Sequence, residues 1–453
     1  MTRCDACPGT KKCIPPDGYL DAAVWGIGEG PGFDEERLNC VFSGRTGKEL
    51  RNHYIRLSGI HPSNFLLANA ISCMPDTPGG KITLDQDKDR HLLETCSQHN
   101  LIPLIKEYRP KLLVLMGAFA CHAIDPCIDL ELQHGMPVQT PYGTAFVLYH
   151  PSVGLYEPKR MLMLRNDWMR LKRYMNGTLR LARDEHPKPI YKEITGRDQL
   201  IRTLHDSRQE DMAIDTESTR RREPFCLTYS VKPGTGFLIR ASSDVLRVFQ
   251  RFLNEWRGRI ILHNLLYDSR VLKCTGIILP KSKVRCTMLR AFNLGNLPQG
   301  LKALAYRELG MTMEDFDDVV TPHSKPIVLD YLREVFTETW PDPDEVLERK
   351  ADGTFKIKKP QNFRTKLKRF WGDYTKNEAK DPFKAWENWE ESWPMVEERC
   401  GPFPGKCISH VPFELALTYA CRDADATLRL WQREEYMTRR VRRVSQDSWG
   451  EES

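Results

Sequence analysis

The sequence contains no apolar run long enough to cross a bilayer. Its longest apolar stretch, LLVLMGAFACHAI, is well short of the roughly 20 residues that a transmembrane helix needs, and it includes a histidine. The first residues, MTRCDACPG, lack the apolar core of a secretory signal peptide. Both absences argue against a membrane-bound or secreted protein, so we expect a cytoplasmic protein that does not act in a membrane.

The sequence also has little excess charge, since the formal net charge is +6 over 453 residues. The basic residues are nevertheless clustered, in runs such as PKRMLMLRNDWMRLKR, KIKKPQNFRTKLKRFW and TRRVRR. Basic grooves with aromatic side chains are typical of proteins that bind single-stranded nucleic acid, although charge runs are also common on ordinary solvated faces. The charge pattern alone leaves both interpretations open.

Cysteine, in contrast, is not scarce. Fourteen cysteines in a chain of this type argue against a disulfide scaffold and favour metal or cluster ligands. Cys4 and Cys7 form a CxxC motif, Cys73 lies further along, and Cys96 is expected to begin a helical segment. Four thiolates from separated loops can hold an iron-sulfur cluster or a zinc ion, and Cys13 could replace one of them.

The length and the hydrophobic pattern predict two α/β domains. From 21 to about 151, the apolar runs AAVWGI, NFLLANA, KLLVLMGA and TAFVLYH alternate with helix-like segments, which predicts a parallel sheet, followed by a basic helix at about 158–174. From about 190, the runs MAIDTEST, FCLTYSV, TGFLIR and RIILH predict a mixed sheet flanked by helices. We predict domains at 1–177 and 190–453, a linker at 178–189, and an insertion at about 311–410.

The turn GEGPGFDEER follows the first predicted strand. It is not a Walker phosphate loop, because Phe33 and Asp34 stand where that loop needs Lys and then Ser or Thr. Each predicted strand of this domain ends in a polar signal or a glycine, and these are Gly28 with Glu29, Asn69, Gly117 and His150. Because ligands of parallel α/β sheets bind at the carboxyl ends of the strands, we expect a single crevice there.

These features together resemble the iron-sulfur uracil-DNA glycosylases known as family 4. The resemblance rests on CDAC, GEGPGFDEE, VFSGRTGKEL, NAISC, the spaced Cys96, KLLVLMGAFA and HPSVGL, in that order from Cys4 to Leu155. It implies that Phe42 stacks on an extruded uracil, that Asn69 pairs with the edge of the base, and that His150 stabilises charge on the departing base. It also implies a [4Fe-4S] cluster held by Cys4, Cys7, Cys73 and Cys96.

The chemistry of base excision explains these residue types. Breaking a base-sugar bond leaves an oxocarbenium-like sugar and a uracil anion, which calls for a donor at the base oxygen, His150, and a carboxylate near the sugar, Glu29. Gly28 and Gly30 would let the backbone approach the flipped base. Each residue also has a simpler interpretation: Asn69 could merely end a strand, and His91, in a longer segment than expected, is either a covalent base trap or an exposed histidine.

The second half of the sequence contains separated acidic residues in a recognisable pattern. AIDTES places Asp215 and Glu217 two apart on a predicted strand, so that both carboxylates face the same side. Asp268 follows Asn264, a predicted helix N-cap, and Tyr419 lies one helical turn before Asp423. Carboxylates brought together repel one another unless cations hold them, and two hard divalent ions are what phosphodiester hydrolysis uses.

These motifs, with LKALAYRELGM, resemble the DEDDy 3'-5' exonucleases, including the proofreading domain of family A DNA polymerases, across about Ile190 to Trp431. The resemblance implies a ribonuclease H-like fold in which Asp215, Glu217, Asp268 and Asp423 bind two Mg²⁺ or Mn²⁺ ions. Tyr419 would orient the attacking water. The arginines at 220–222 could contact substrate phosphates or simply lie in a solvated loop.

The sequence therefore predicts a bifunctional DNA repair or replication enzyme, in which one domain excises uracil and the other degrades DNA from its 3' end. DNA is the expected partner, as single strands or 3' ends, and a replicative DNA polymerase is a further candidate. In a first alternative, the N-terminal domain is a non-catalytic DNA-binding module that serves the exonuclease. In a second, the whole chain is a replication scaffold with decayed sites.

Overall fold

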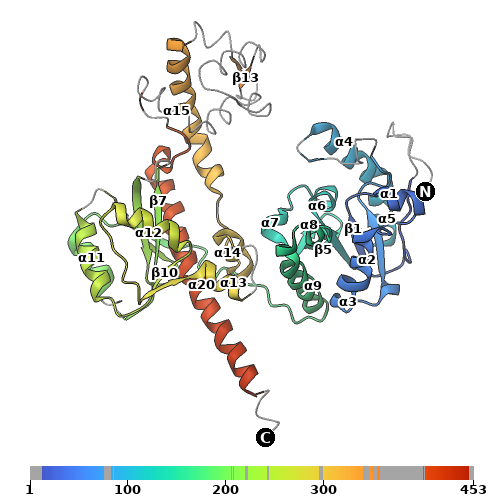
Figure 1. Cartoon of the computed structure of the whole chain (residues 1–453), viewed down its shortest axis with the longest axis horizontal. Helices are drawn as coiled ribbons and strands as arrows, with labels where there is room; N and C mark the ends of the chain where they lie inside the picture. The colour runs from blue at the N-terminus through green and yellow to red at the C-terminus, as the bar shows by residue number, and fades with distance from the viewer. Residues whose placement is uncertain are drawn as a thin grey trace. The chain divides into compact units, whose positions relative to one another are not determined.

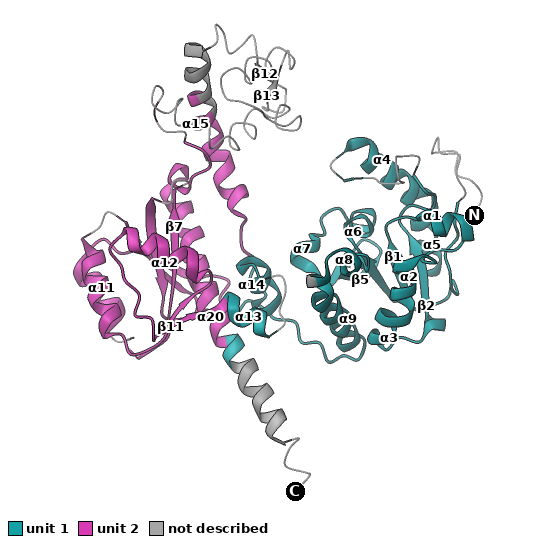
Figure 2. Cartoon of the chain, in the orientation of Figure 1, with its two compact units in different colours: residues 1–185, 288–312, 433–453 teal, residues 186–287, 313–432 magenta. Residues whose placement is uncertain are grey.

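The chain forms two compact α/β units in the computed structural model (Figures 1 and 2). The first unit comprises 1–185, 288–312 and 433–453, and the second comprises 186–287 and 313–432. The structure describes residues 13–75, 83–84, 86–205, 207, 209–219, 223–241, 244–294, 299–339, 347–349, 355–357, 401 and 404–447. No helix of this described part is both long enough and apolar enough to cross a membrane.

The first unit is built on a five-stranded sheet with the order β2-β1-β3-β5-β4. The strands are β1 Val24–Gly28, β2 Phe65–Asn69, β3 Leu112–Met116, β4 Pro137–Thr140 and β5 Gly143–Leu148. The four predicted apolar runs form β1, β2, β3 and β5, which pair in parallel as expected. The edge strand β4 pairs antiparallel with β5, so the sheet is mixed. The short PVQT segment lacks the apolar pattern that would have predicted β4.

Helices cover both faces of this sheet because successive strand residues point to opposite sides. Val24 faces the core that contains Trp168, whereas Trp25 faces the core that contains Leu93. The helices are α1 Phe33–Leu38, α2 Arg45–Glu49, α3 Ile55–Ser58, α4 Asp87–Cys96, α5 Ile102–Tyr108, α6 Ala118–Ile124, α7 Leu130–Gln133, α8 Val153–Tyr156 and α9 Met161–Met175. The predicted basic helix is α9, preceded by a short 3₁₀ turn.

A later segment of the sequence completes the first unit. Residues 288–312 belong to it and contain most of α13 (Thr287–Asn293) and all of α14 (Leu301–Leu309). Within this unit α14 packs against α7. The chain therefore leaves the first unit after 185 and returns to it with a helix that the resemblance had assigned to the exonuclease.

The second unit contains a six-stranded mixed sheet with the order β11-β10-β7-β8-β9-β6. The strands are β6 Ile190–Glu193, β7 Met212–Ser218, β8 Pro224–Ser230, β9 Thr235–Arg240, β10 Ile260–Leu262 and β11 Val284–Cys286. β7, β8 and β9 pair antiparallel, while β6, β10 and β11 add in parallel. The predicted mixed sheet flanked by helices is thus confirmed.

Among the described residues, the α-helices that belong wholly or mainly to the second unit are α10 Arg197–His205, α11 Val245–Glu255, α12 Leu265–Cys274, α15 Phe316–Thr339 and α20 Phe413–Asp447. The predicted insertion at about 311–410 includes α15 and a strand pair, β12 Leu347–Arg349 with β13 Phe355–Ile357. Most of the basic run at 356–371 and the arginines at 220–222 lie outside the described residues.

Candidate functional site

The carboxyl ends of β1, β2, β3 and β5 bring together the residues of the first predicted site. A Cβ added to Gly28 would lie 2.4 Å from Phe42 Cζ and 2.7 Å from Asn69 Oδ1. At Gly117, which has a φ of +95°, an added Cβ would lie 3.1 Å from His150 Cβ. The Phe42 and His150 rings are 6.1 Å apart between centroids. Glycines are therefore needed where the side chains of the site approach the strand ends.

Backbone pairing continues beyond β1 and β2 and keeps the turn beside Asn69. The amides of Ala70 and Ile71 donate to the carbonyls of Gly28 and Glu29, each at 2.9 Å. Burial raises the pKa of Glu29 from 4.5 to about 7. Glu29 is therefore a carboxylate whose ionisation changes near neutral pH, at the position where the sequence predicted an acid beside the sugar.

His150 is held as a neutral hydrogen-bond donor. Its Nδ1 lies 2.7 Å from Ser152 Oγ, and the Ser152 amide donates to the same nitrogen at 3.4 Å. Because Nδ1 accepts from this amide, the proton of the neutral ring is on Nε2. Burial lowers the pKa of His150 from 6.5 to about 4, so the ring stays neutral at physiological pH. A neutral imidazole N–H can stabilise developing negative charge without being an acid itself.

Phe42 has an unusual backbone conformation, with a φ of +52°. Two features hold it there. Arg51 Nη2 donates to Val41 O at 3.0 Å and pairs with Asp17 at 2.6 Å. Gly47 passes so close that an added Cβ would lie 1.7 Å from Phe42 O. A left-handed conformation in a bulky residue is a strained feature that is typical of functional sites.

Glu35 joins the two loops that form this crevice. Its carboxylate accepts from the Gly32 amide at 3.1 Å and from the Gly44 amide at 2.9 Å. It thereby ties the GEGPG turn to the loop of Phe42. Sequence reasoning did not single out Glu35 or Arg51, although both lie in or next to the motifs that carry the resemblance.

A cysteine cluster lies beyond Asn69. The Cys13 side chain hydrogen bonds with that of Cys73, and this bond is the main cause that lowers the Cys13 pKa to about 6. Cys96 Sγ accepts from the Ser72 amide at 3.2 Å. Cys96 is the last residue of α4 and also the N-cap of the π-helical segment Ser97–Leu101 that follows, so it lies at a junction within a continuing helical stretch. Cys4 and Cys7 lie outside the described residues.

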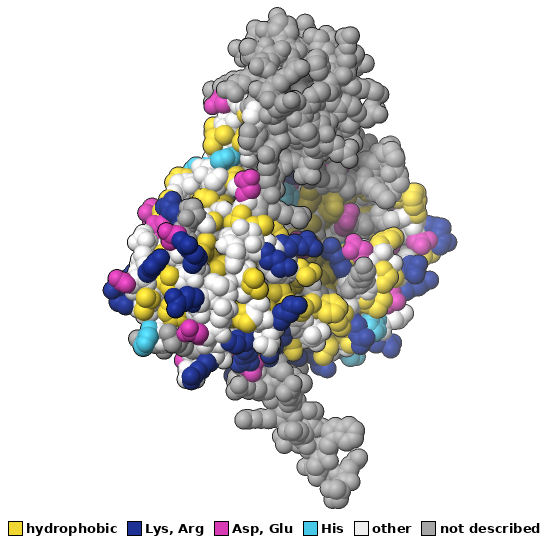
Figure 3. Space-filling model, turned by 60° about the vertical axis from the view of Figure 1, so that its left-hand side comes forward, with side chains coloured by type: hydrophobic (Ala, Val, Ile, Leu, Met, Phe, Trp, Pro, Cys, Tyr) yellow, Lys and Arg dark blue, Asp and Glu magenta, His cyan; other side chains and the backbone are white. Residues whose placement is uncertain are grey.

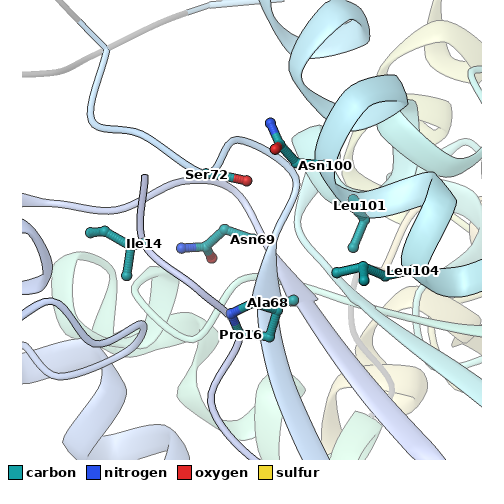
Figure 4. A pocket seen from close by; sticks show the side chains of 8 residues that line it. All are labelled: Ile14, Pro16, Ala68, Asn69, Ser72, Asn100, Leu101 and Leu104. Atoms are coloured by element: carbon teal, nitrogen blue, oxygen red, sulfur yellow. The ribbon is translucent and has the colours of Figure 1, made fainter. Parts of the chain in front are cut away.

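A small pocket lies beside Asn69 (Figure 4). Ile14, Ser72 and Asn100 line it together with Asn69, and Asn100 Nδ2 lies 3.5 Å from Cys96 Sγ. Asn69 is the residue of the predicted site that lines this pocket, and Glu29, Phe42 and His150 are not among its lining residues. Thiols that receive N–H donors are suited to ligate iron-sulfur clusters. The thiol of Cys96, which receives N–H donors from Ser72 and Asn100, therefore fits such a group.

The second unit brings three carboxylates to one point. Asp215 and Glu217 of β7 and Asp423 of α20 each offer an oxygen, and these oxygens all lie within 4.8 Å of one another. Burial raises the pKa of Asp215 well above its usual range, and Asp268, Asp423 and Glu217 raise it further in that order. All four predicted acids are thus close enough to repel one another.

Asp268 approaches the group from α12. Its Oδ1 accepts a hydrogen bond of 2.8 Å from Thr216 Oγ1. Its Oδ2 is buried and has no hydrogen-bond partner within the described residues. Burial raises the Asp268 pKa to about 7. Asn264 is the N-cap residue of α12 as predicted, but its side chain makes no capping hydrogen bond. An orphaned carboxylate oxygen beside three other acids fits a divalent cation.

Tyr419 and Asp423 reach this point because α20 is fixed against the sheet. Thr228 Oγ1 donates to Ala420 O at 3.1 Å, and Thr228 is opposite Asp215 in the β7–β8 register. An added Cβ on Gly236 would lie 2.7 Å from Cys421 Cβ, so helix and strand are in close contact. Burial raises the pKa of Tyr419, and Asp423, Glu217 and Asp215 raise it further. Tyr419 therefore stays a protonated phenol beside the acids.

Basic side chains do not form one continuous patch on the face seen in Figure 3. Lys and Arg lie among hydrophobic and acidic side chains over that face. His91 is exposed on α4, which agrees with the simpler of its two interpretations. The charge pattern of this face therefore adds little to the case for nucleic acid.

Comparison with known proteins defines the class of the first unit. Residues 15–175 match the family model "Uracil DNA glycosylase superfamily". The N-terminal part of the chain therefore carries a domain of that superfamily. Among curated proteins, this part of the chain is 28% identical over 158 residues to a type-4 uracil-DNA glycosylase of Thermotoga maritima. The aligned residues cover 34% of this chain and 78% of the relative. A type-4 uracil-DNA glycosylase of Archaeoglobus fulgidus is 24% identical over 178 residues, covering 37% and 85%.

Solved nucleases also match part of the chain. A structure described as the apo form of the nuclease has 24% identity and a TM-score of 0.23, and covers 28% of this chain and 62% of its own. Brucella melitensis NrnC with bound Mg²⁺ has 18% identity and a TM-score of 0.23, and covers 28% and 65%. This chain thus spans less than two thirds of either nuclease.

Proposed function

We propose that the protein is a bifunctional DNA-processing enzyme. The N-terminal unit removes uracil from DNA, and the second unit degrades DNA from the 3' end with two divalent cations. The observation that carries the proposal is the presence of two separate side-chain constellations, each with the groups that its reaction needs. The superfamily match and the type-4 relatives support the first activity. The second rests on the half-buried acidic cluster and the DEDDy resemblance.

In uracil excision, each residue of the crevice has one task. Phe42 forms a wall for the everted base, and the Asn69 amide offers a donor and an acceptor to the edge of uracil. As the base-sugar bond breaks, the His150 Nε2–H donates to the base oxygen on which negative charge develops. The Glu29 carboxylate stabilises positive charge on the sugar and orients the water that completes hydrolysis. Gly28 and Gly30 leave room for the nucleotide.

In strand degradation, the protein supplies the ligands and the orientation of water. Asp215, Glu217, Asp268 and Asp423 are positioned to hold two Mg²⁺ or Mn²⁺ ions. Such ions activate water and stabilise the leaving oxygen of a phosphodiester. The Tyr419 hydroxyl donates to or accepts from the attacking water and so fixes its direction. The hydrogen bond from Thr216 favours the ionised form of Asp268 against the effect of burial.

The cysteines hold an iron-sulfur cluster in this proposal. Cys73 and Cys96 are ligands, and Cys4, Cys7 and Cys13 are the candidates for the remaining positions. Cys73 lies in the loop that directly follows Asn69, the last residue of β2, so a ligand at Cys73 anchors the chain next to the residue that reads the base. A [4Fe-4S] cluster in this place is structural support for the crevice.

One assay separates the two activities, because excision needs no divalent ion. A 5'-labelled single strand with one uracil is incubated with EDTA and treated with alkali, and in parallel it is incubated with Mg²⁺. We expect one break at the uracil in the first sample and a ladder of shortened products in the second. His150→Ala removes only the break, and Asp215→Ala removes only the ladder.

Other results would contradict parts of the proposal. A ladder without the break would mean that the N-terminal unit is a non-catalytic DNA-binding module for the exonuclease. The absence of both products would favour a scaffold with decayed sites. Purified protein that contains zinc in place of iron and sulfide would refute the cluster assignment.

A further inference from the structure

Helix α14 presents a buried, charged face to the rest of the first unit. Arg307 is 7% exposed and Glu308 is 9% exposed, while the neighbouring Leu304 and Ala305 are fully buried. Charged side chains are almost never buried to this extent unless partners compensate their charge. The side chains that pair with Arg307 and Glu308 therefore show which part of the unit α14 packs against.

Arg307 is bound to a buried histidine. Arg307 Nη1 hydrogen bonds with His134 Nε2, and His134 Nδ1 lies 2.7 Å from Asp167 Oδ2. A guanidinium can only donate, so Nε2 must accept and the proton of His134 must be on Nδ1, from which it is donated to Asp167. The three side chains thus link α14 through the end of α7 to α9.

Two further contacts complete the network around α14. Glu308 Oε1 lies 3.7 Å from Arg170 Nη1, and Arg170 Nε donates to Gly135 O at 2.8 Å. The Gln133 amide donates to the Tyr306 hydroxyl at 3.3 Å. Arg307 and Arg170 are thereby balanced by Asp167 and Glu308. Without α14, His134 Nε2 would be a buried acceptor without its donor. The buried negative charge of Asp167 would also lose the cation that compensates it.

The same segment of chain supports the strand that leads to His150. The Gly135 amide donates to Val147 O at 2.8 Å, and the Val147 amide donates to Met136 O at 3.0 Å. The His134 ring lies 4.8 Å from the Tyr149 ring. Tyr149 directly precedes His150, so a shift of the His134 segment would be passed to the end of β5.

We propose that α14 is a docked part of the excision unit, and that Arg307 is a positioning residue that fixes His150 through His134 and Tyr149. The positioning role rests on the proposed uracil excision, whereas the docking does not. Arg307 acts through its contacts and does not take part in the chemistry. The excision unit therefore includes a helix that lies more than a hundred residues beyond the end of its superfamily match.

The test uses the full chain with Arg307→Ala, Arg307→Lys and a matched control, Arg56→Ala, which removes an exposed arginine of the same unit. Hydrogen exchange followed by mass spectrometry reports on peptides that cover 134–149. We expect about tenfold faster exchange there in Arg307→Ala, because the local opening energy falls, an intermediate rate in Arg307→Lys, and the wild-type rate in Arg56→Ala. Exchange at the wild-type rate in Arg307→Ala would overturn the docking.

Excision kinetics then test the positioning role. We expect kcat of Arg307→Ala to fall about tenfold with KM within about twofold, because a displaced His150 donor weakens only the transition-state contact. Faster exchange with an unchanged kcat would overturn the positioning role. A wild-type protein without excision activity would overturn both the proposed function and the positioning role, while the exchange data would still decide the docking. If Arg307→Ala does not fold, the same measurements on Arg307→Lys decide both parts.

Discussion

The Thr216 hydroxyl donates a hydrogen bond of 2.8 Å to Asp268 Oδ1. Thr216 lies on β7 between Asp215 and Glu217, and Asp268 lies on α12, so this bond joins two motifs that are 52 residues apart. A donor to a carboxylate favours its ionised form, which is the form that binds a cation. Burial acts in the opposite direction and holds the Asp268 pKa at about 7.

Replacing Thr216 by Val is therefore expected to weaken the exonuclease. The substitution keeps the shape of the side chain but removes the donor, so the Asp268 pKa rises further and less carboxylate is present at pH 7. We expect the rate of strand degradation to fall about tenfold at pH 7, the effect of roughly 1.5 kcal/mol from one hydrogen bond to a charged group. The rate should partly recover at pH 8.5, where the carboxylate is ionised again.

The control for this prediction is Thr216→Ser, which retains the hydroxyl and should keep most of the activity. Both rates are measured on a 5'-labelled single strand with Mg²⁺. If Thr216→Val degrades DNA as fast as the wild type at pH 7, the hydrogen bond has no role in keeping Asp268 competent for metal binding.

The sequence alone predicted those parts of the molecule that depend on local pattern. Apolar runs indicated β1, β2, β3 and β5, and a spacing of two placed Asp215 and Glu217 on one face of β7. It did not predict contacts that depend on distant partners. Thr228, which anchors α20, bonds to a carbonyl 192 residues away.

Buried charge was the other feature that local pattern could not predict. Arg307 lies in LKALAYRELGM, where an arginine has the appearance of a solvated helix charge, yet it is bound to His134, 173 residues earlier. Likewise Phe42 was singled out for its ring, but nothing in its neighbours' identities predicted a positive φ. That conformation depends on the close approach of Gly47 and on Arg51.

Uracil excision should depend on pH through Glu29 and not through His150. Excision needs the Glu29 carboxylate, and the pKa of Glu29 is raised to about 7, so the rate should rise from pH 6 and level off above about pH 8. The pKa of His150 is lowered to about 4, so the ring is neutral over this whole range and adds no second ionisation to the pH profile of the rate. The measurement is single-turnover excision in EDTA between pH 5.5 and 9.

Glu29→Gln is the matched variant for this profile. It cannot ionise, so its excision rate should be low and independent of pH over the same range. A profile in Glu29→Gln that still rises with a midpoint near 7 would assign the titration to another group.

Gly28 should tolerate no side chain. A Cβ at this position would lie 2.4 Å from the Phe42 ring and 2.7 Å from Asn69 Oδ1. Gly28→Ala must therefore displace Phe42, which stacks on the base, or Asn69, which binds its edge. We expect excision to fall at least a hundredfold, because misplacement of about 1 Å has effects of this size. At Gly30 the nearest protein atom to an added Cβ, Ile71 Cβ, would be 3.4 Å away. Gly30→Ala therefore displaces neither Phe42 nor Asn69, and it should lose less activity than Gly28→Ala although its methyl group takes up room beside the nucleotide. Equal losses in both variants would argue against this geometry.

Divalent cations should stabilise the second unit, because they relieve the repulsion between its clustered carboxylates. At a concentration a hundred times the dissociation constant, a bound ion adds about 2.7 kcal/mol to the free energy of unfolding, which raises the melting temperature by about 5 °C or more. In Asp423→Asn, one charge of the cluster is removed. This variant should melt higher than the wild type without metal and gain much less from Mn²⁺.

Differential scanning calorimetry with and without Mn²⁺ measures both effects. Asp198→Asn is the control, because Asp198 is an exposed acid on α10 of the same unit and its loss should leave the metal-dependent gain unchanged. The two results depend on one cause, since the charges that destabilise the metal-free unit are the charges that bind the ions. An Asp423→Asn variant that melts lower without metal, yet gains as much from Mn²⁺ as the wild type, would show that this cluster does not hold the cations.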